Sequence, residues 1–273
     1  MGICRFCGKP AGFLKSEHKE CRERHNRGIF IIRSMVESSL KGNIEKDKIL
    51  ETAENSYIND TELKDVIFSG WVEALENALE DRLISEDEEN ILSNILFQFG
   101  FSSEELSSNT SYIKFIKAIV LRDVLEGKIP NRVRIDTTLP FNFLKDEKII
   151  WIFMNTRYYQ FKTHKYYTGG SQGFSIRITK GVYYRVGGFR GHPVSKTELT
   201  LIDEGILCIT NKNIYFGGKE KSFRINYNKI VSFHPYSDGI GIQRDSANAK
   251  PEVFITDDGW FTYNLLVNLA NKV

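Results

Sequence analysis

The chain has 273 residues, of which 37 are Lys or Arg, 35 are Asp or Glu and 41% are hydrophobic, and its formal net charge is +2. This length suggests about one to three domains and is enough to bury a substantial core. The longest apolar runs, such as residues 149–154, are far shorter than the roughly 20 residues that cross a bilayer. Because charged residues and cysteines come first, we expect no signal peptide. The composition argues against a secreted disulfide scaffold, a membrane-spanning protein and a wholly basic nucleic-acid binder.

Charge is distributed unevenly along the chain. Residues 1–41 carry nine Lys or Arg against four Asp or Glu, residues 42–128 carry eight against 19, and residues 129–273 carry 20 against 12. This basic, acidic, basic order indicates modules with different surfaces. The acidic segment could dock against either end of the chain, or a basic module could bind an anionic partner, a membrane surface or nucleic acid. Plain solvated charge is the alternative.

Three of the four cysteines lie near the start of the chain and form the pattern C-x2-C-x10-H-x2-C with Cys4, Cys7, His18 and Cys21. A two-residue gap lets both thiolates of a tight turn reach one tetrahedral ion, and Gly8 permits the backbone of that turn. His18 and Cys21 are three residues apart, so on the first turn of a helix they share a face. Four nitrogen and sulfur ligands leave no open position, which predicts a structural zinc ion. A disulfide, a redox pair and a chance arrangement are the alternatives.

The N-terminal module is too small to bury a core of its own, so we expect zinc binding, on the order of 10–16 kcal/mol, to supply most of its stability. His25 is the only rival ligand, and we predict that it faces solvent on the continuing helix. Basic residues surround the module, but it lacks the three-base reading helix of a two-Cys, two-His finger. We expect the knuckle to brace the next helix or to contact a protein. Cys208, in an apolar strand-like run, is predicted to be an inert core thiol.

Residues 17–128 contain no proline and have the pattern of an acidic helical segment. Apolar residues repeat at three- and four-residue steps over 66–79. Ser85 and Ser102 are each followed by Glu three residues later, which is the capping-box pattern that begins a helix. Asp60 is expected to begin another helix, and we predict about five helices in one bundle.

Residues 78–89 and 99–105 resemble the "D-G-x-h-S-x-x-E … h-G-h-S-x-x-E" cadence of TerB-like helical domains of tellurite-resistance proteins. The resemblance implies a bundle over residues 27–128 and, as in that family, metal binding through acidic side chains. The residues on which such binding would fall are Asp81, Glu86, Asp87 and Glu89. Arg82 stands where that family has a small residue. The alternative is an acidic first turn that faces water and is favoured by the helix dipole.

Beyond Pro130 and Pro140 the sequence changes to strand-like periodicity. Short β-rich runs are separated by turn signals such as Gly169-Gly170 and Gly187-Gly188. The runs are residues 149–161, 174–179, 182–186, 198–201, 206–210, 214–216, 222–226, 230–233, 239–243 and 253–256. Residues 257–260 then cap a last amphipathic helix. If the Trp260 ring is buried under that helix, its removal would cost roughly 3–5 kcal/mol.

A series of antiparallel strands followed by one helix is the layout of a pleckstrin-homology-like (PH-like) barrel. Residues 205–216 resemble the "G-x-L-x-h-T-x-x-x-h-h-F" signature of GRAM domains, which are PH-like. Residues 223–232 follow as in that family. The resemblance implies a barrel whose relatives bind phosphoinositides or proteins. A loose basic set would then be the anion- or lipid-binding residues, namely Lys162, Lys165, Arg177, Lys180, Arg185 and Arg190. Because no single loop gathers them, a protein-binding or scaffolding barrel is favoured.

Together these features predict an α+β multidomain protein with a zinc knuckle or ribbon over residues 1–26, an acidic TerB-like all-α bundle over 27–128 and a GRAM/PH-like antiparallel β-barrel, capped by a C-terminal helix, over 140–273. This organisation resembles that of bacterial or phage-type cytoplasmic proteins. It implies a non-catalytic adaptor for a protein partner in a stress or phage-related response, with peripheral attachment to anionic lipid of the inner membrane as an option. A nucleic-acid-associated regulator that uses the basic N-terminus is the second hypothesis. A hydrolase with an unrecognised site is the third, although no nucleophile-elbow, P-loop or dinucleotide motif occurs.

Overall fold

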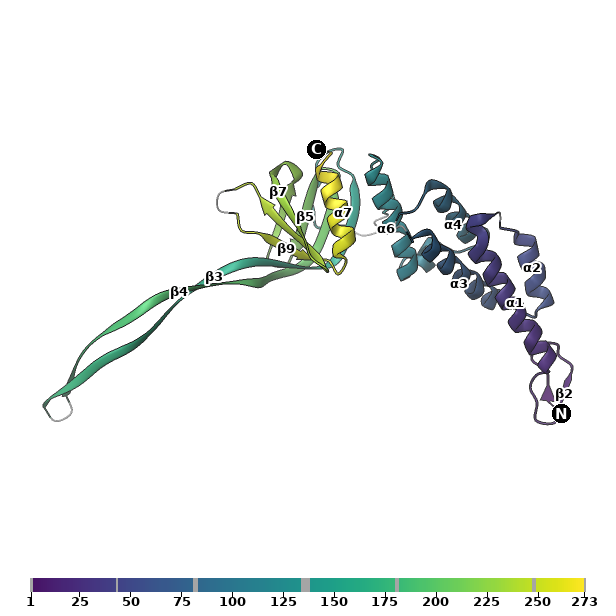
Figure 1. Ribbon diagram of the computed structural model, residues 1–273, viewed down its shortest axis with the longest axis horizontal. Coiled ribbons are helices and arrows are strands. Elements are labelled where there is room, and N and C mark those ends of the chain that lie inside the picture. The colour runs from purple at the N-terminus through teal and green to yellow at the C-terminus, as the bar shows by residue number, and fades with distance from the viewer. Residues whose placement is uncertain are drawn as a thin grey trace. The chain divides into compact units, whose positions relative to one another are not determined.

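The computed structural model describes residues 2–42, 44–80, 83–133, 138–179, 182–246 and 249–272, and within 164–195 it describes the backbone alone. The chain is of mixed α and β structure and divides into two compact units, Met1–Arg132 and Val133–Val273. Figure 1 shows that helices dominate the first unit and strands dominate the second, which also carries the helix α7. Within the part of the chain described, no helix is both long and apolar enough to cross a membrane.

The first unit begins with a small antiparallel hairpin and continues with helices. Its elements are β1 (Gly2–Ile3), β2 (Pro10–Gly12), α1 (Lys19–Glu37), η1 (Ser38–Lys41), α2 (Lys46–Asn55), α3 (Asp60–Ala78), α4 (Glu86–Gln98), α5 (Ser103–Leu106) and α6 (Thr110–Leu125).

Local sequence sets several helix starts in this unit. The Ser85 side chain accepts a hydrogen bond from the N–H of Glu88, and the Glu88 carboxylate accepts one from the N–H of Ser85. Ser102 and Glu105 form the same reciprocal pair at the start of α5. Both predicted capping boxes are therefore confirmed, and α3 begins at Asp60 as predicted.

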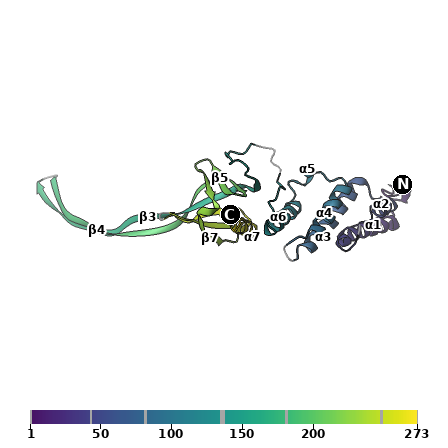
Figure 2. The same ribbon diagram turned by 90° about the horizontal axis from the view of Figure 1, so that it is seen from above.

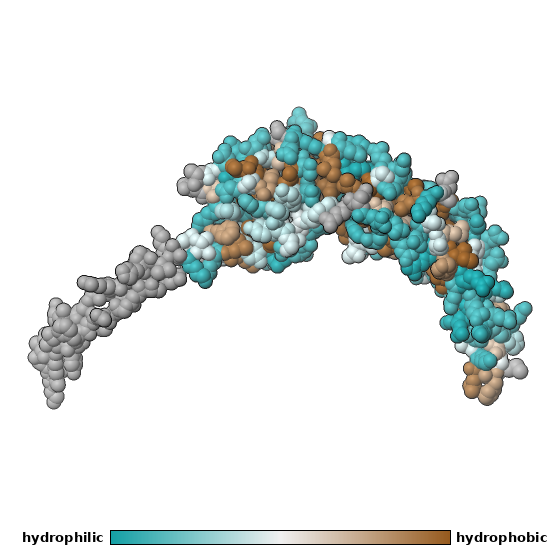
Figure 3. Space-filling model, in the orientation of Figure 1, coloured by the Kyte–Doolittle hydropathy of each residue, from teal (hydrophilic) through white to brown (hydrophobic). Residues whose placement is uncertain are grey.

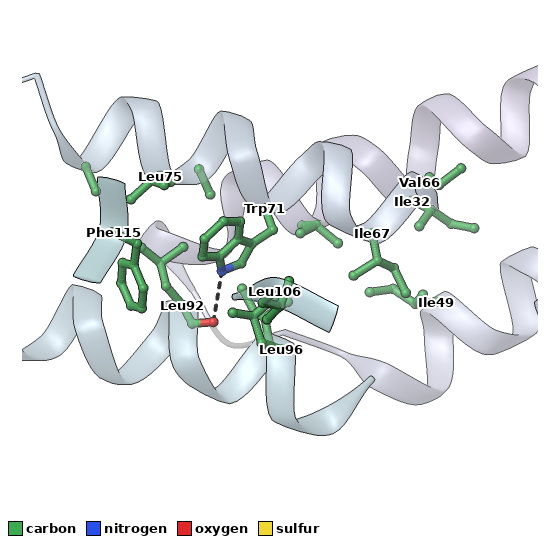
Figure 4. Packing of buried hydrophobic residues seen from close by; sticks show 14 of the residues in the cluster. Ile32, Ile49, Val66, Ile67, Trp71, Leu75, Leu92, Leu96, Leu106 and Phe115 are labelled. Carbon is green, nitrogen blue, oxygen red and sulfur yellow. Dashed lines mark hydrogen bonds between the residues drawn. The ribbon is translucent and has the colours of Figure 1, made fainter. Parts of the chain in front are cut away.

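Trp71 of α3 lies at the centre of the helical core and is fully buried. Its indole Nε1 donates to the Leu92 carbonyl at 3.0 Å, as the dashed line in Figure 4 shows. The Phe68 ring stacks on it at 5.4 Å and the Phe115 ring meets it edge-on at 5.5 Å. Burial of such a ring with its one polar atom satisfied ties α3, α4 and α6 into one core.

The second unit is a curled, half-barrel antiparallel sheet with strand order β6-β5-β4-β3-β9-β8-β7. Figure 2 gives the view from above, with α7 beside β7. The elements are β3 (Ile149–Thr179), β4 (Val182–Thr210), β5 (Asn213–Gly218), β6 (Ser222–Asn226), η2 (Tyr227–Lys229), β7 (Ile230–Pro235), β8 (Gly239–Arg244), β9 (Glu252–Ile255) and α7 (Gly259–Ala270).

The turns expected at Gly169-Gly170 and Gly187-Gly188 are wrong, because both dipeptides lie inside the long strands β3 and β4. From Tyr159 to Arg177 the two strands pair without a register shift, with Gly169 opposite Gly191 and Gly173 opposite Gly187. The pairing of β3 with β9 covers residues 157–160 and that of β4 with β5 covers 205–209. Beyond them a two-stranded ribbon extends from the sheet (Figure 1). A glycine in this ribbon still forms the backbone hydrogen bonds of a strand, and no core at that position requires a side chain.

The C-terminal helix α7 contacts β7 and β8, and Phe261 belongs to its buried face. Phe261 is 2% exposed and its ring lies 5.0 Å from that of Trp151. Trp260 is 44% exposed, so its ring is not buried under the helix, and the cost of roughly 3–5 kcal/mol considered for a buried ring does not apply. The helix cap was predicted correctly, because the Asp258 side chain accepts from the N–H of Phe261 at 3.2 Å. Successive helical residues point about 100° apart, which places one ring in the core and its neighbour at the surface.

Candidate metal centre

The four predicted ligands converge in the N-terminal hairpin. Cys4 follows β1, Cys7 lies in the turn before β2, His18 is the N-cap residue of α1, and Cys21 lies in the first turn of that helix. One ligand atom from each lies within 4.8 Å of all the others. Cys4 is 1% exposed, while the other three ligands are half-buried. This cluster could hold a metal ion.

The distances fit a tetrahedral ion. With Zn–S bonds of about 2.3 Å and Zn–N bonds of about 2.0–2.1 Å, tetrahedral angles place sulfur and nitrogen about 3.5 Å apart. His18 Nδ1 lies 3.4 Å from the Cys7 sulfur and 3.7 Å from the Cys21 sulfur. Three sulfurs and one nitrogen are a donor set that suits zinc.

Backbone hydrogen bonds hold the knuckle in this shape. The Cys4 N–H donates to the Lys9 carbonyl and the Gly8 N–H to the Cys4 carbonyl, both at 2.9 Å. Gly8 has φ +69°, a left-handed conformation that most residues adopt only with strain. The backbone N–H of His18 lies 3.4 Å from the Cys4 sulfur and can donate to its thiolate. The turn that carries Cys4 and Cys7 therefore depends on Gly8, as the sequence pattern predicts.

The imidazole of His18 is oriented by a second contact. Its Nε2 lies 3.0 Å from the Pro10 carbonyl oxygen, so that a proton on Nε2 is donated there and Nδ1 is left facing the sulfurs. Such a carbonyl partner fixes the ring orientation of a metal-ligating histidine. The hydrogen bond to Pro10, followed by that with Cys7, raises the pKa of His18 above its ordinary value.

The thiols differ in acidity. Burial raises the pKa of the Cys4 thiol, but hydrogen bonds from the backbone of Cys7 and His18 lower it more, to about 6. Burial raises the pKa of Cys21 to about 11, and its contacts with the Cys7 and Cys4 sulfurs raise it in the same direction. A cation at the centre would reverse the repulsion between these thiolates and displace their protons, which makes metal binding dependent on pH.

His25 does not face solvent, so that prediction is wrong. It is 8% exposed, with Nδ1 lying 3.0 Å from the Ser56 carbonyl and Nε2 lying 2.9 Å from the Glu62 carboxylate. Its ring also lies 4.7 Å from that of Phe6, whose ring is 6.3 Å from that of Tyr57. His25 is therefore engaged with the helices rather than with the Cys/His cluster, and the Phe6 contact fastens the knuckle to them.

Two of the four acidic residues suggested as TerB-type ligands, Glu86 and Glu89, form ion pairs with basic side chains. Glu86 forms an ion pair with Lys128. Glu89 contacts Arg122 at 2.5 Å and Arg132 at 2.8 Å. Asp87 is exposed, and Asp81 and Arg82 lie outside the described residues. In the part of the chain described, the Cys/His cluster is the single group that meets the geometry for a metal ion.

Five of the six residues in the basic set suggested for anions belong to the long strands β3 and β4. Lys162 is exposed. The backbone of Lys165, Arg177, Arg185 and Arg190 is paired, but their side chains lie outside the described structure, as does Lys180 altogether.

Cys208 is fully buried, and burial raises its pKa to about 12. The burial of this thiol and its raised pKa both agree with the predicted inert core thiol.

Comparison of the chain with protein-family models, with curated proteins and with solved structures finds no match.

Proposed function

We propose that the chain is a non-catalytic adaptor whose N-terminal knuckle, held by a structural zinc ion, presents a binding surface to a protein partner. The observation that carries this proposal is the closed donor set of Cys4, Cys7, His18 and Cys21. Four protein ligands complete a tetrahedral shell and leave no position for a water molecule or a substrate. Such an ion holds the fold of the module and does no chemistry.

The junction between the knuckle and the helices supports an adaptor role. Phe6 packs against His25 of α1 at 4.7 Å, and its ring also lies 6.3 Å from the Tyr57 ring after α2. The knuckle is thereby attached on one side to α1 and to the segment after α2. A module fixed on one side and free on the other can present a surface without moving it.

The proposed zinc ion is tested by measuring the zinc content of the wild-type protein and of the variants Cys4→Ser and Cys21→Ser. Wild type is expected to carry one zinc per chain. Both variants should lose it and become sensitive to proteases within residues 1–26, while the second unit stays folded. A wild-type protein that folds without metal overturns the structural-zinc proposal.

The proposed binding of a protein partner is tested with purified proteins. A protein captured by the wild-type chain, but not by Cys21→Ser, is purified and its affinity for both forms is measured. Restoration of binding to the wild type by zinc after chelation supports the adaptor role. Equal affinity for the two forms removes the knuckle as the binding surface.

A second candidate function, association with nucleic acid, is supported by the ribbon. Between residues 162 and 196 the sequence carries seven Lys or Arg and no Asp or Glu. The backbone of residues 162–179 pairs with that of residues 182–198 as a two-stranded antiparallel ribbon. A two-stranded ribbon fits the major groove of duplex DNA, and one without further packing is marginally stable in water. A basic ribbon of this kind is suited to a phosphate-rich partner.

The test is a shortened ribbon. Thr163 pairs with Thr197, so an Asn-Gly turn can replace residues 164–196 and leave the sheet intact. Wild type is expected to bind duplex oligonucleotides, with log K falling by about 0.9 per phosphate contact for each unit of log salt. The shortened protein should melt at the same temperature and lose binding. Equal binding by both proteins, or none by wild type at low salt, removes this candidate.

A further inference from the structure

The knuckle carries three large apolar side chains at the surface. Ile3 of β1 is 67% exposed, and Phe13 and Leu14, which follow β2, are 84% and 89% exposed. In Figure 3 hydrophobic residues are seen at the N-terminal end of the first unit. We call Ile3, Phe13 and Leu14 the knuckle tip.

Backbone contacts bring the knuckle tip together. β1 and β2 are paired, with Gly2 opposite Gly12 and Ile3 opposite Pro10. The chain after the Phe13-Leu14 loop then returns beside β1, where the N–H of Arg5 donates to the Ser16 carbonyl at 2.9 Å. The three apolar side chains therefore belong to one small framework that the four ligands stabilise.

The loop of the knuckle tip is held in an unfavourable conformation. Leu14 has φ +56°, in the left-handed region that a branched apolar residue rarely adopts. Its side chain is also the most exposed of the large apolar ones described. Leu14 therefore contributes little to the stability of the fold, because its backbone is strained and its side chain is not buried. Backbone strain of this kind tends to occur at functional sites.

Cationic side chains border the knuckle tip. Lys9 and Lys15 are exposed, and among the described residues neither has an ion-pair partner within 4.0 Å. Arg5 is also exposed but pairs with Glu17 at 2.8 Å. Over residues 1–27 the sequence carries seven Lys or Arg and three Asp or Glu. The charge of the module is thus complementary to an anionic surface.

We propose that the knuckle tip inserts Phe13, Leu14 and Ile3 into the interfacial layer of an anionic lipid membrane, with Lys9 and Lys15 at the headgroups. Apolar side chains that enter the acyl boundary, together with a basic surround, are the two contributions that bind peripheral proteins to anionic bilayers. The apolar groups are convex and flanked by lysines, which suits a deformable anionic layer better than a preformed protein groove. This inference goes beyond the proposed protein-binding function and rests on the same zinc-held knuckle.

The direct test uses tryptophan as a depth probe. Phe13→Trp places an indole at the tip, and its emission is measured against the unmodified chain, whose Trp71, Trp151 and Trp260 lie elsewhere. With vesicles of phosphatidylcholine and phosphatidylserine, we expect a blue shift and quenching by lipids brominated on the acyl chain. With phosphatidylcholine alone, both changes should be much smaller. An unchanged spectrum with anionic vesicles overturns the inference.

Matched variants separate insertion from folding. Leu14→Gly relieves the left-handed strain, so the knuckle should keep its zinc and its melting temperature while the partition coefficient falls at least tenfold. Lys9→Glu combined with Lys15→Glu should lower the coefficient on anionic vesicles and leave it unchanged on neutral ones. Phe30→Ser is the control, because Phe30 is 72% exposed but lies on α1 outside the tip. If Phe30→Ser weakens binding as much as Leu14→Gly does, the tip is not the membrane contact.

Failure of this inference differs from failure of the proposed function. Full zinc content with no vesicle binding overturns the inference and leaves the adaptor proposal standing. A wild-type protein without zinc overturns the proposed function. Binding of the wild type to a purified protein, abolished by Leu14→Gly in the absence of lipid, would assign the tip to a protein partner and also overturn the inference.

Discussion

Substitution of His25 by Phe tests how α1 is attached to α3 and to the segment that follows α2. The ring volume and the contact with Phe6 remain, but both ring nitrogens are lost. The buried Ser56 carbonyl then lacks its partner, which costs about 1–3 kcal/mol. The Glu62 side chain is 33% exposed, so its lost contact adds at most about 1 kcal/mol. We expect the free energy of unfolding of the first unit to fall by about 1–4 kcal/mol.

The measurement is urea unfolding followed by far-ultraviolet circular dichroism, together with zinc content. His25→Phe should keep its full zinc content, because Cys4, Cys7, His18 and Cys21 supply the four ligands. His234→Phe is the control, since His234 is exposed in the second unit, and it should leave the unfolding of the first unit unchanged. Loss of zinc in His25→Phe would show that His25 is a ligand, and an unchanged stability would show that its two hydrogen bonds are not formed.

Three further predictions concern the second unit. Phe261→Ala should destabilise it by about 3–5 kcal/mol in thermal or urea unfolding, because a buried ring is removed, whereas Trp260→Ala should cost less than about 1 kcal/mol; equal effects would contradict the assigned faces of α7. Burial raises the pKa of Glu147, but hydrogen bonds from neighbouring side chains lower it more, to below its ordinary value of 4.5. The stability from this carboxylate is therefore present above pH 4.5 and is lost as pH falls through the folded pKa. In Glu147→Gln the free energy of unfolding should depend less steeply on pH over this acidic range, and an unchanged slope would contradict the assignment. Cys208 should resist alkylation until the unit unfolds, even after chelation has exposed the other thiols, and its modification in the folded protein would refute its burial.

Features set by neighbouring residues were predictable from the sequence. A capping box joins a Ser to a Glu three residues later, so Ser85 and Ser102 identify their helix starts without knowledge of the fold. The metal cluster follows similarly, because Cys4 and Cys7 share one turn and His18 and Cys21 share one helical turn.

Features set by distant partners could not be predicted in the same way. The contacts of His25 lie 31 and 37 residues away, at Ser56 and Glu62, and no local pattern indicates them. The paired glycines of β3 and β4 have the local pattern of turns, and only the register of the opposite strand shows that they lie inside a ribbon. The knuckle tip was missed for another reason. The pair Phe13-Leu14, in a module too small for a core, was the signal that could have revealed exposed apolar side chains.

The zinc content of the purified wild-type chain tests the central claim most directly. The geometry of the four donors predicts one zinc per chain, retained through dialysis and released by a strong chelator together with exposure of three thiols. A folded protein that contains no zinc, and whose N-terminal cysteines react as freely before chelation as after it, would contradict the account.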